Sequence, residues 1–382
     1  MIGKRSLNLL IPGALALSGF WACSGSHSSG DYDSDAFIAD TLTHHARYLT
    51  ISDIGGGTVL ADIADPWNDG AFLGRYALVH RDSTIPDGLP EGTAVIRTPV
   101  ERAAVYSSVH TGGIAELGAL GSVCAVADPA YFPDGDTIHT LISEGKIVDL
   151  GPVQSPSAEK IVAAGTELVL RSPMQGVTAA PLPRSVVPVE LADYLETTPI
   201  GRAEWILLLG ELTGKRTEAR QMFDGVIDRY SELVFKAGGS ALPKPKVLTE
   251  SEQSGVWYLP AGGSYMARMI NDAGGVWPWA DTEGSGSLPL SLEKVAERAL
   301  DADVWLLRTF GYAASPKTLV AADSRYAAFK PVKEGTVYGC DTSVKPLYNE
   351  LAFHPEYLLA DYVAIFHPDV MPDYELRYFV RE

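Results

Sequence analysis

The sequence predicts an α/β protein in which two lobes, each with a mainly parallel sheet, are joined by a long bridging α-helix. Short apolar runs alternate with helical patterns from residue 93 to residue 200, and the same alternation restarts after residue 239. Strands that alternate with helices are typical of βαβ units and parallel sheets. Between the halves, apolar residues recur at helical spacing over 201–238. A chain of 382 residues is long enough for two lobes with separate cores.

The first lobe is expected over 48–200. Its first part, 48–80, alternates apolar and polar residues, and three glycines at 55–57 mark a turn, so antiparallel hairpins are predicted there. The pattern then changes to that of a parallel sheet. Strands are predicted at 93–100, 121–128, 145–150, 166–172 and 185–190, and helices at 101–120, with an internal turn around Gly112 and Gly113, and at 157–165.

The bridging helix is expected over 201–238, and the second lobe over 239–382. Gly210 and Gly214 disfavour a helix, so a kink or break is predicted there. Without a break the helix would be about 50 Å long, at about 1.5 Å per residue. In the second lobe, strands are predicted at 244–251, at the end of 290–307 and at 335–340, and helices at 264–275, at the start of 290–307 and at 355–367.

The N-terminus has the pattern of an export signal. Lys4 and Arg5 precede a mostly apolar stretch over 7–21, which is too short to span a bilayer comfortably. Cys23 follows the small Ala22, and this arrangement resembles a bacterial lipoprotein signal, in which the cysteine becomes the acylated mature N-terminus. The resemblance implies a signal peptide over 1–22 and a flexible, Ser/Gly/Asp-rich tether over 23–47. An ordinary cleaved signal, or a buried helix with an incidental cysteine, is the alternative.

Composition excludes some classes of partner. The formal net charge is −18, which argues against nucleic acid and against electrostatic docking on anionic lipid. Cys124 lies in an apolar run and is expected to be buried. A disulfide between Cys124 and Cys340 remains open, because both lie in an exported chain but in different halves. The sequence has no Cys-x-x-Cys spacing for a metal.

Five segments, in order, resemble the helix-linked class of periplasmic binding proteins, whose members take up vitamin B12, iron–siderophores and haem. Thr166 and Glu167 depart from that pattern, which usually has Pro-Asp before the strand, and the hairpins at 48–80 are less typical of it. The segments are VIRTPVERAAVYSSVHTGGIAELGALGSVCAVAD (95–128), VDLGPVQSPSAEKIVAAGTELVL (148–170), GRAEWILLLGELTGKRTEA (201–219), SYMARMINDAGG with LSLEKVAERALDADVWLL (264–275 and 290–307), and PEYLLADYVAIFHPD (355–369).

The resemblance implies a cleft between the lobes, and the loops after the strands supply the candidate ligand-binding residues. A large planar ligand needs flat aromatic walls with few polar anchors. For each aromatic candidate, a place in the core is the alternative. Arg97 could pair with a ligand carboxylate or an anionic iron chelate, or equally with Glu101. The candidates are Arg97, Thr98, Pro99, Tyr131, Phe132, Gln154 and Pro156 in the first lobe, and Trp257, Tyr258, Tyr265, Thr309, Phe310, Tyr312 and Asn349 in the second.

Two glutamates occupy matching Ser-x-Glu-x-aliphatic motifs, one in each lobe. Glu159 and Glu293 each fall in the first turn of a predicted helix, where an acid complements the helix dipole. In the family that the chain resembles, the matching glutamates pair with arginines of the permease. The resemblance therefore implies that Glu159 and Glu293 dock the protein on an ABC transporter permease dimer.

No catalytic motif or metal-binding spacing is present in the sequence. The eight histidines form no H-E-x-x-H or related pattern, and His110 alone lies near the expected pocket loops, where it could ligate haem iron. There is no G-x-S-x-G elbow and no P-loop. We therefore expect no enzyme activity and no cofactor, although a bound cargo could contain Fe or Co.

The sequence analysis thus predicts a monomeric, lipid-anchored solute-binding protein of the periplasm. It would capture a siderophore complex, haem or a corrinoid and deliver it to an ABC importer. Few basic residues near the pocket loops favour a corrinoid or a neutral iron complex over a triply anionic chelate. The alternatives are a surface lipoprotein that binds a glycan or a protein partner, and a lipoprotein hydrolase. Which ligand binds, and which membrane holds the anchor, remain open at this point.

Overall fold

The computed structural model describes residues 40–132 and 137–381, all within one compact unit, Asp35–Glu382. The expected signal peptide (1–22), the acylated Cys23 and the tether up to residue 39 lie outside the described residues. Within the described ranges, no helix has both the length and the apolar character that crossing a membrane requires.

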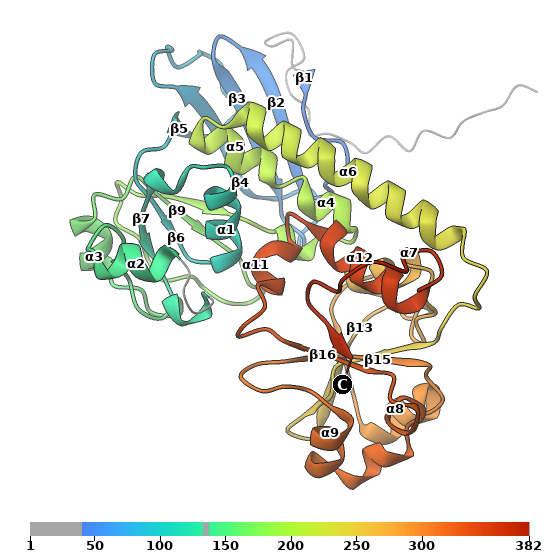
Figure 1. Cartoon of the computed structure of the whole chain (residues 1–382). Helices are drawn as coiled ribbons and strands as arrows, with labels where there is room; N and C mark the ends of the chain where they lie inside the picture. The colour runs from blue at the N-terminus through green and yellow to red at the C-terminus, as the bar shows by residue number, and fades with distance from the viewer. Residues whose placement is uncertain (1–39, 133–136, 382) are drawn as a thin grey trace, which may run out of the picture. The chain divides into compact units, whose positions relative to one another are not determined.

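The first lobe opens with a five-stranded sheet in the order β1-β2-β3-β4-β5 (Figure 1). Neighbouring strands are antiparallel except β4 and β5, which run parallel. The glycines at 55–57 all have positive φ, a conformation that side chains disfavour, so they form the β2–β3 turn. The predicted hairpin is confirmed. The strands are β1 (Asp40–Thr41), β2 (Leu49–Gly55), β3 (Thr58–Ala64), β4 (Phe72–His80) and β5 (Ala94–Thr98).

A second sheet of the first lobe is parallel throughout, with strand order β10-β9-β6-β7-β8. Its two faces pack into separate cores, one shared with the first sheet and one closed by α3. The strands are β6 (Ala103–Val105), β7 (Val123–Val126), β8 (Val148–Asp149), β9 (Leu168–Arg171) and β10 (Val187–Glu190), and the helices are α1 (Ser108–Glu116), α2 (Thr137–Ser143) and α3 (Ala158–Ala163).

The helix predicted over 101–120 is wrong at its start. Residues 103–105 form the central strand β6, buried between β7 and β9, and only α1 is helical. A short run of buried Ala and Val fits either structure, and here sheet pairing decides it. The turn expected at Gly112 and Gly113 is also wrong, because α1 continues through both. Gly113 is needed there, since a Cβ would lie 2.5 Å from a ring carbon of Phe353.

The last part of the expected tether, 40–47, is instead held against the first lobe. The carboxylate of Glu204 accepts hydrogen bonds from the backbone N–H groups of residues 44–46 at 2.7–2.8 Å. Glu196 accepts those of residues 47 and 48 at 2.9–3.0 Å. Both carboxylates are buried, and β1 pairs with β2. Residues 40–47 are therefore part of the folded first lobe and not of a flexible tether.

Three helices replace the single bridging helix expected over 201–238. The break falls at Gly214, which has φ 71°. At Gly210 a Cβ would lie 2.4 Å from the Cβ of Ala219, so the two longer helices pack closely there. The last helix has 23 residues and is about 35 Å long, rather than about 50 Å. The helices are α4 (Pro199–Ala203), α5 (Ile206–Thr213) and α6 (Arg216–Gly238).

Helix α6 connects the two lobes. Its first half contributes Phe223 and Val226 to the core of the first lobe, and its second half contributes Tyr230 and Leu233 to that of the second. It packs against α5 at one end and α12 at the other, and Figure 1 shows it in yellow-green between them. One amphipathic helix thus belongs to both hydrophobic cores.

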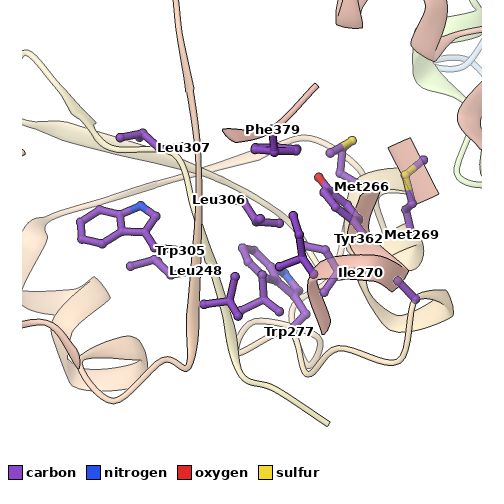
Figure 2. Close-up of a cluster of buried hydrophobic side chains, with 14 of the residues drawn as sticks. Leu248, Met266, Met269, Ile270, Trp277, Trp305, Leu306, Leu307, Tyr362 and Phe379 are labelled. Carbon is purple, nitrogen blue, oxygen red and sulfur yellow. The ribbon is translucent and has the colours of Figure 1, made fainter. Parts of the chain in front are cut away.

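The second lobe contains a sheet of order β11-β15-β16-β17, parallel except for β17, and an antiparallel sheet β12-β13-β14. Figure 2 shows its core, where Trp305 and Leu306 of β15 lie with Trp277 and Tyr362. The strands are β11 (Val247–Thr249), β12 (Glu252–Gln253), β13 (Val256–Pro260), β14 (Ser287–Leu290), β15 (Val304–Thr309), β16 (Val337–Asp341) and β17 (Val380–Arg381). The helices are α7 (Tyr265–Asp272), α8 (Leu292–Ala299), α9 (Pro316–Ala322), α10 (Lys330–Glu334), α11 (Leu347–Leu351) and α12 (Pro355–Phe366).

The two remaining cysteines are free and buried in the cores of different lobes. Burial raises the pKa of the Cys124 thiol, and raises that of Cys340 to about 12. Both thiols are therefore protonated at neutral pH, and neither is bonded to the other.

The lobes also meet where α1 faces α11 and the start of α12, a region that we call the inter-lobe junction. Phe353 follows α11, yet it is 2% exposed within the first-lobe core. His354 Nε2 lies 2.6 Å from Glu116 Oε1 on α1, and His354 Nδ1 lies 2.8 Å from Glu356 Oε1 on α12. Arg229 of α6 donates to the same Glu356 oxygen at 2.8 Å. Because both ring nitrogens face carboxylates, both can donate only when the imidazole is protonated.

The proton on His354 links the junction to pH. Burial disfavours the charged imidazole, but hydrogen bonds to Glu116 and Glu356 outweigh it and raise the pKa of His354 to about 9. An unperturbed histidine has a pKa of about 6.5. The stabilisation is therefore complete below about pH 6.5 and is lost as the pH rises through about 9.

We expect His354→Gln to lower the free energy of unfolding by about 1–2 kcal/mol below pH 6.5, and by progressively less toward pH 9–10. This change is smaller than the shift in the pKa of His354 alone implies, because Glu116 is 45% exposed and solvent screens its interaction with His354. Urea unfolding of wild type and variant from pH 6 to pH 10 measures it, with His80→Gln as an exposed-histidine control. A wild-type advantage that stays constant across this range would contradict the role of the proton.

Candidate functional site

A cavity of about 460 Å³ is lined by side chains from both lobes; we call it the cleft. Four of its residues are aromatic and well exposed: Tyr131 from the first lobe, and Phe310, Tyr312 and Tyr348 from the second, with exposures of 67%, 62%, 51% and 48%. Large apolar rings that face open space are costly unless something covers them. The other lining residues are Ser108, Gln253, Arg308, Thr309, Thr342, Lys345, Pro346 and Asn349.

The cleft lies at the carboxyl ends of parallel strands, where open α/β sheets place ligands. Tyr131 ends a 3₁₀ turn, Pro129–Tyr131, that follows β7. Phe310 and Tyr312 follow β15, and Tyr348 belongs to α11, after β16. The loop after β15 is fixed at two points: the N–H of Gly311 donates to Asp341 Oδ1 at 2.9 Å, and the hydroxyl of Thr309 donates to the carbonyl of Tyr312.

The charged side chains that line the cleft are both cations. Arg308 forms an ion pair with Glu250 and lies over the ring of Tyr348, 5.8 Å from its centre. Lys345 donates from Nζ to the carbonyl of Arg377 at 2.9 Å. Among the described residues that line the cleft, none is Asp, Glu or His. The cleft can therefore stack a flat ligand and attract a negative group on it.

A second cavity, of about 790 Å³, lies in the first lobe and shares Ser108 and Tyr131 with the cleft. We call it the side chamber. Its walls come from the turn between β3 and β4, from the start of α1, from Gln154, and from the segment 172–180 after β9. Its apolar lining residues are Trp67, Leu73, Tyr106, Val109, Ala127, Val153, Pro173, Met174, Val177, Ala179, Ala180 and Tyr194.

A buried polar network forms one wall of the side chamber. His110 Nε2 lies 2.8 Å from Asp193 Oδ1, and Arg202 Nε donates to Asp193 Oδ2 at 3.1 Å. Arg202 also donates to the hydroxyl of Tyr265 at 2.8 Å. Burial opposes the charge of Asp193, but His110 and Arg202 outweigh it and lower the pKa of its carboxyl to about 2. His110 is thus a partner of Asp193 and only 2% exposed, which does not fit the suggested haem ligand.

Several candidates from the sequence do line these cavities. The structure brings Tyr131, Thr309, Phe310, Tyr312 and Asn349 together around the cleft, and it places Gln154 on the side chamber. These residues follow strands of both lobes, as the loop argument requires.

Two aromatic candidates are core residues, which corrects the expectation for them. Trp257 is fully buried, stacks on Trp305 with ring centres 5.5 Å apart, and donates from Nε1 to the carbonyl of Thr249 at 3.0 Å. Phe132 is 5% exposed and packs in the first-lobe core. A place in the core was the alternative for both, and for Trp257 the periodicity within the five-residue strand β13 does not separate the two cases.

Six further candidates line neither cavity. Arg97 donates to the carbonyl of Ser83 at 2.6 Å and does not pair with Glu101, which contacts Arg81 instead. Thr98 is 7% exposed at the end of β5 and precedes a cis peptide bond to Pro99, which contacts Gly214. Pro156 lies before α3 and lines neither cavity.

Tyr258 and Tyr265 are the other two. Tyr258 is half exposed on β13, away from both cavities. Tyr265 begins α7, and its hydroxyl is held by Arg202.

Sequence reasoning missed Arg308, Lys345 and Tyr348. In the segment after the strand predicted at 335–340, the sequence analysis names only Asn349 as a candidate. The same rule of loops after strands also covers Lys345 and Tyr348. Arg308 lies within β15, where nothing in the sequence distinguishes a residue that faces a cavity. The buried Asp193–Arg202 pair had no signal in the sequence.

Glu159 and Glu293 are both exposed in the first turns of α3 and α8, behind the side-chain caps Ser157 and Ser291. Glu293 Oε1 lies 3.1 Å from Arg325 Nη1. For Glu159 no ion pair is present within the described part of the chain. In the same ranges, no three His, Cys, Asp or Glu side chains are grouped in a way that could hold a metal ion.

A family model described as periplasmic binding protein matches residues 104–344. An uncharacterized lipoprotein of Methanocaldococcus jannaschii is 27% identical over 356 residues, which cover 87% of this chain and 83% of that protein. A periplasmic haem-binding protein from Pseudomonas aeruginosa aligns with a TM-score of 0.55 at 15% identity, covering 70% of this chain and 93% of its own. A TroA-like periplasmic binding protein, FepB, from Veillonella parvula aligns with a TM-score of 0.54 at 14% identity, covering 73% and 89%.

At these identities the solved structures show the fold, and it is the α/β fold that the sequence predicts. The matched segment begins at residue 104. The sheet β1–β5 therefore lies outside it, in agreement with the less typical hairpins noted from the sequence.

Proposed function

The chain belongs to the periplasmic binding protein family, and from this premise we propose that it captures a planar, iron- or cobalt-containing complex and delivers it to an ABC importer. The observation that carries the proposal is the cleft itself. Four exposed aromatic rings from both lobes meet two cations there, and no acid lines it among the described residues.

The residues that line the cleft favour one of the cargo classes that the sequence left open. Aromatic walls suit a flat macrocycle or an aryl-bearing chelate, because ring faces stack at little entropic cost. Arg308 and Lys345 suit a ligand with carboxylates. Haem combines these features, so it leads over a neutral iron complex or corrinoid. The related structures include a haem-binding protein, which supports the same choice.

Delivery would use Glu159 and Glu293, one on each lobe. Both carboxylates are exposed, so a permease arginine can reach them without opening the fold. At Glu293 the incoming cation would replace or share Arg325. Exposed pairs of this kind contribute only about 0–1 kcal/mol, so the exchange costs little.

The protein would act in the periplasm, held at a membrane by acyl chains on Cys23. The apolar leader, Cys23 and the polar segment that follows it support this placement. A lipoprotein relative of similar length supports it as well. An anchored carrier stays close to its permease, which raises the effective concentration of the pair.

We expect Phe310→Ala and Tyr312→Ala each to weaken haemin binding by at least fivefold, since each removes one stacking wall. Lys345→Gln should weaken it to a similar degree by removing a cation. Tryptophan quenching of Asp35–Glu382 by haemin, cyanocobalamin and ferric siderophores, corrected for absorption, gives the affinities.

Phe235→Ala is the control, because this ring is 83% exposed on α6 and lines neither cavity. If none of the ligands binds saturably, the cargo class is wrong. If a glycan binds in their place, the alternative of a glycan-binding surface lipoprotein gains support.

We expect Glu159→Lys with Glu293→Lys to abolish cargo uptake in cells while haemin affinity stays unchanged, because both residues lie outside the cavities. Glu144→Lys with Glu297→Lys makes the same change in charge at exposed acids away from helix N-termini, and should leave uptake near normal. Normal uptake by the first double variant would refute the docking role.

We expect metabolic labelling with a palmitate analogue to mark the wild-type chain and to fail on Cys23→Ala. Cys124→Ala should keep the label, because that thiol is buried. Equal labelling of wild type and Cys23→Ala would rule out the anchor and favour an ordinary cleaved signal.

A further inference from the structure

Two residues that line the side chamber come from a part of the chain that the family match does not include. Trp67 lies in the turn between β3 and β4 and Leu73 lies at the start of β4, both before residue 104. This turn is well fixed: the backbone N–H of Trp67 donates to Asp65 Oδ1 at 2.9 Å, and that of Asp65 donates to the carbonyl of Ala71 at 2.9 Å. The N-terminal sheet therefore supplies an ordered wall to a cavity of the first lobe.

Another wall is the segment 172–180, which holds apolar side chains out of the core. Met174 and Val177 are 64% and 60% exposed, and both line the side chamber. A turn joins them, with the N–H of Val177 donating to the carbonyl of Met174 at 3.1 Å. The hydroxyl of Tyr194 donates to the carbonyl of Pro173 at 2.5 Å and attaches the segment to the lobe.

Four charged side chains that line the side chamber form two ion pairs. Arg171 pairs with Glu190 at 2.5 Å, and Arg202 pairs with Asp193 at 3.1 Å. The remaining lining acid, Asp128, accepts the backbone N–H of Val153 at 3.1 Å. A ligand in this chamber therefore meets apolar side chains, two ion pairs and the Asp128 carboxylate, whereas in the cleft Lys345 has no ion-pair partner among the described residues.

The side chamber adjoins the cleft, because Ser108 and Tyr131 line both. Its volume, about 790 Å³, lies within the range of small-molecule sites. We propose that the side chamber is a subsite for a neutral, apolar arm of the cargo, an alkyl or aryl group, whose polar head occupies the cleft. The subsite rests on the proposed function for its partner site, but its own chemistry can be tested separately.

The probe is N-phenyl-1-naphthylamine, a neutral fluorophore that brightens in apolar surroundings. It is titrated into the full chain in nanodiscs, and the signal of empty discs is subtracted. We expect saturable binding to wild type, at least tenfold weaker binding to Ala180→Trp, which fills the chamber, and no change with Val162→Trp. Val162 is an exposed residue of α3 that lines neither cavity.

A second variant keeps the test valid if Ala180→Trp fails to fold. Met174→Asp places an unpaired charge in the chamber from an exposed position. It should weaken binding of the probe several-fold. The subsite would be overturned if wild type gave no saturable signal. It would also be overturned if both chamber variants bound the probe with the same affinity as wild type.

Tyr312→Ala distinguishes the subsite from the cleft, since it should weaken the binding of haemin and leave the affinity for the naphthylamine unchanged. If haemin fails to bind wild type while the naphthylamine binds saturably and is lost in the chamber variants, the subsite is supported and the cargo proposal fails.

Discussion

The inter-lobe junction is the constraint on which the cleft depends. Helix α1 carries Ser108 of the cleft at one end and Glu116 of the junction at the other, and α11 carries Tyr348 just before Phe353. The two helices approach so closely that a Cβ on Gly112 would lie 3.3 Å from the carbonyl oxygen of Asn349. A change at the junction would therefore move both walls of the cleft.

The distribution of charge is the second constraint. The chain is strongly acidic, yet buried carboxylates are used to hold the backbone, as Glu196 and Glu204 do at residues 44–48, and as Asp361 does at residues 377–379. The cleft is lined by cations instead. With a screening length of about 10 Å at 0.1 M salt, a ligand in the cleft responds to Arg308 and Lys345 rather than to the distant acidic surface. Net charge therefore does not decide which ligand the cleft favours.

The alternation of strands and helices was enough to predict the fold, because each βα unit leaves a local periodic pattern. The errors have local causes as well. The run 103–105 is too short for periodicity to distinguish a strand from a helix. The bridging helix breaks at Gly214, but the sequence indicated Gly210 equally well. For the cleft, the rule of loops after strands found Tyr131, Phe310 and Tyr312. It could not distinguish Trp257, which stacks on Trp305 from a strand of the other sheet of the lobe, a contact that no local pattern encodes.

Release of cargo is easier to understand through loops than through rotation of the lobes. A hinge motion would pull Phe353 out of the first-lobe core, which by analogy with truncation of a buried Phe costs about 3–5 kcal/mol, and would also separate His354 from Glu116. The aromatic loop after β15 is held by far less, mainly by Gly311 to Asp341 and Thr309 to Tyr312. The cleft would therefore open first at Phe310 and Tyr312, while α6 and the junction keep the lobes at a fixed separation.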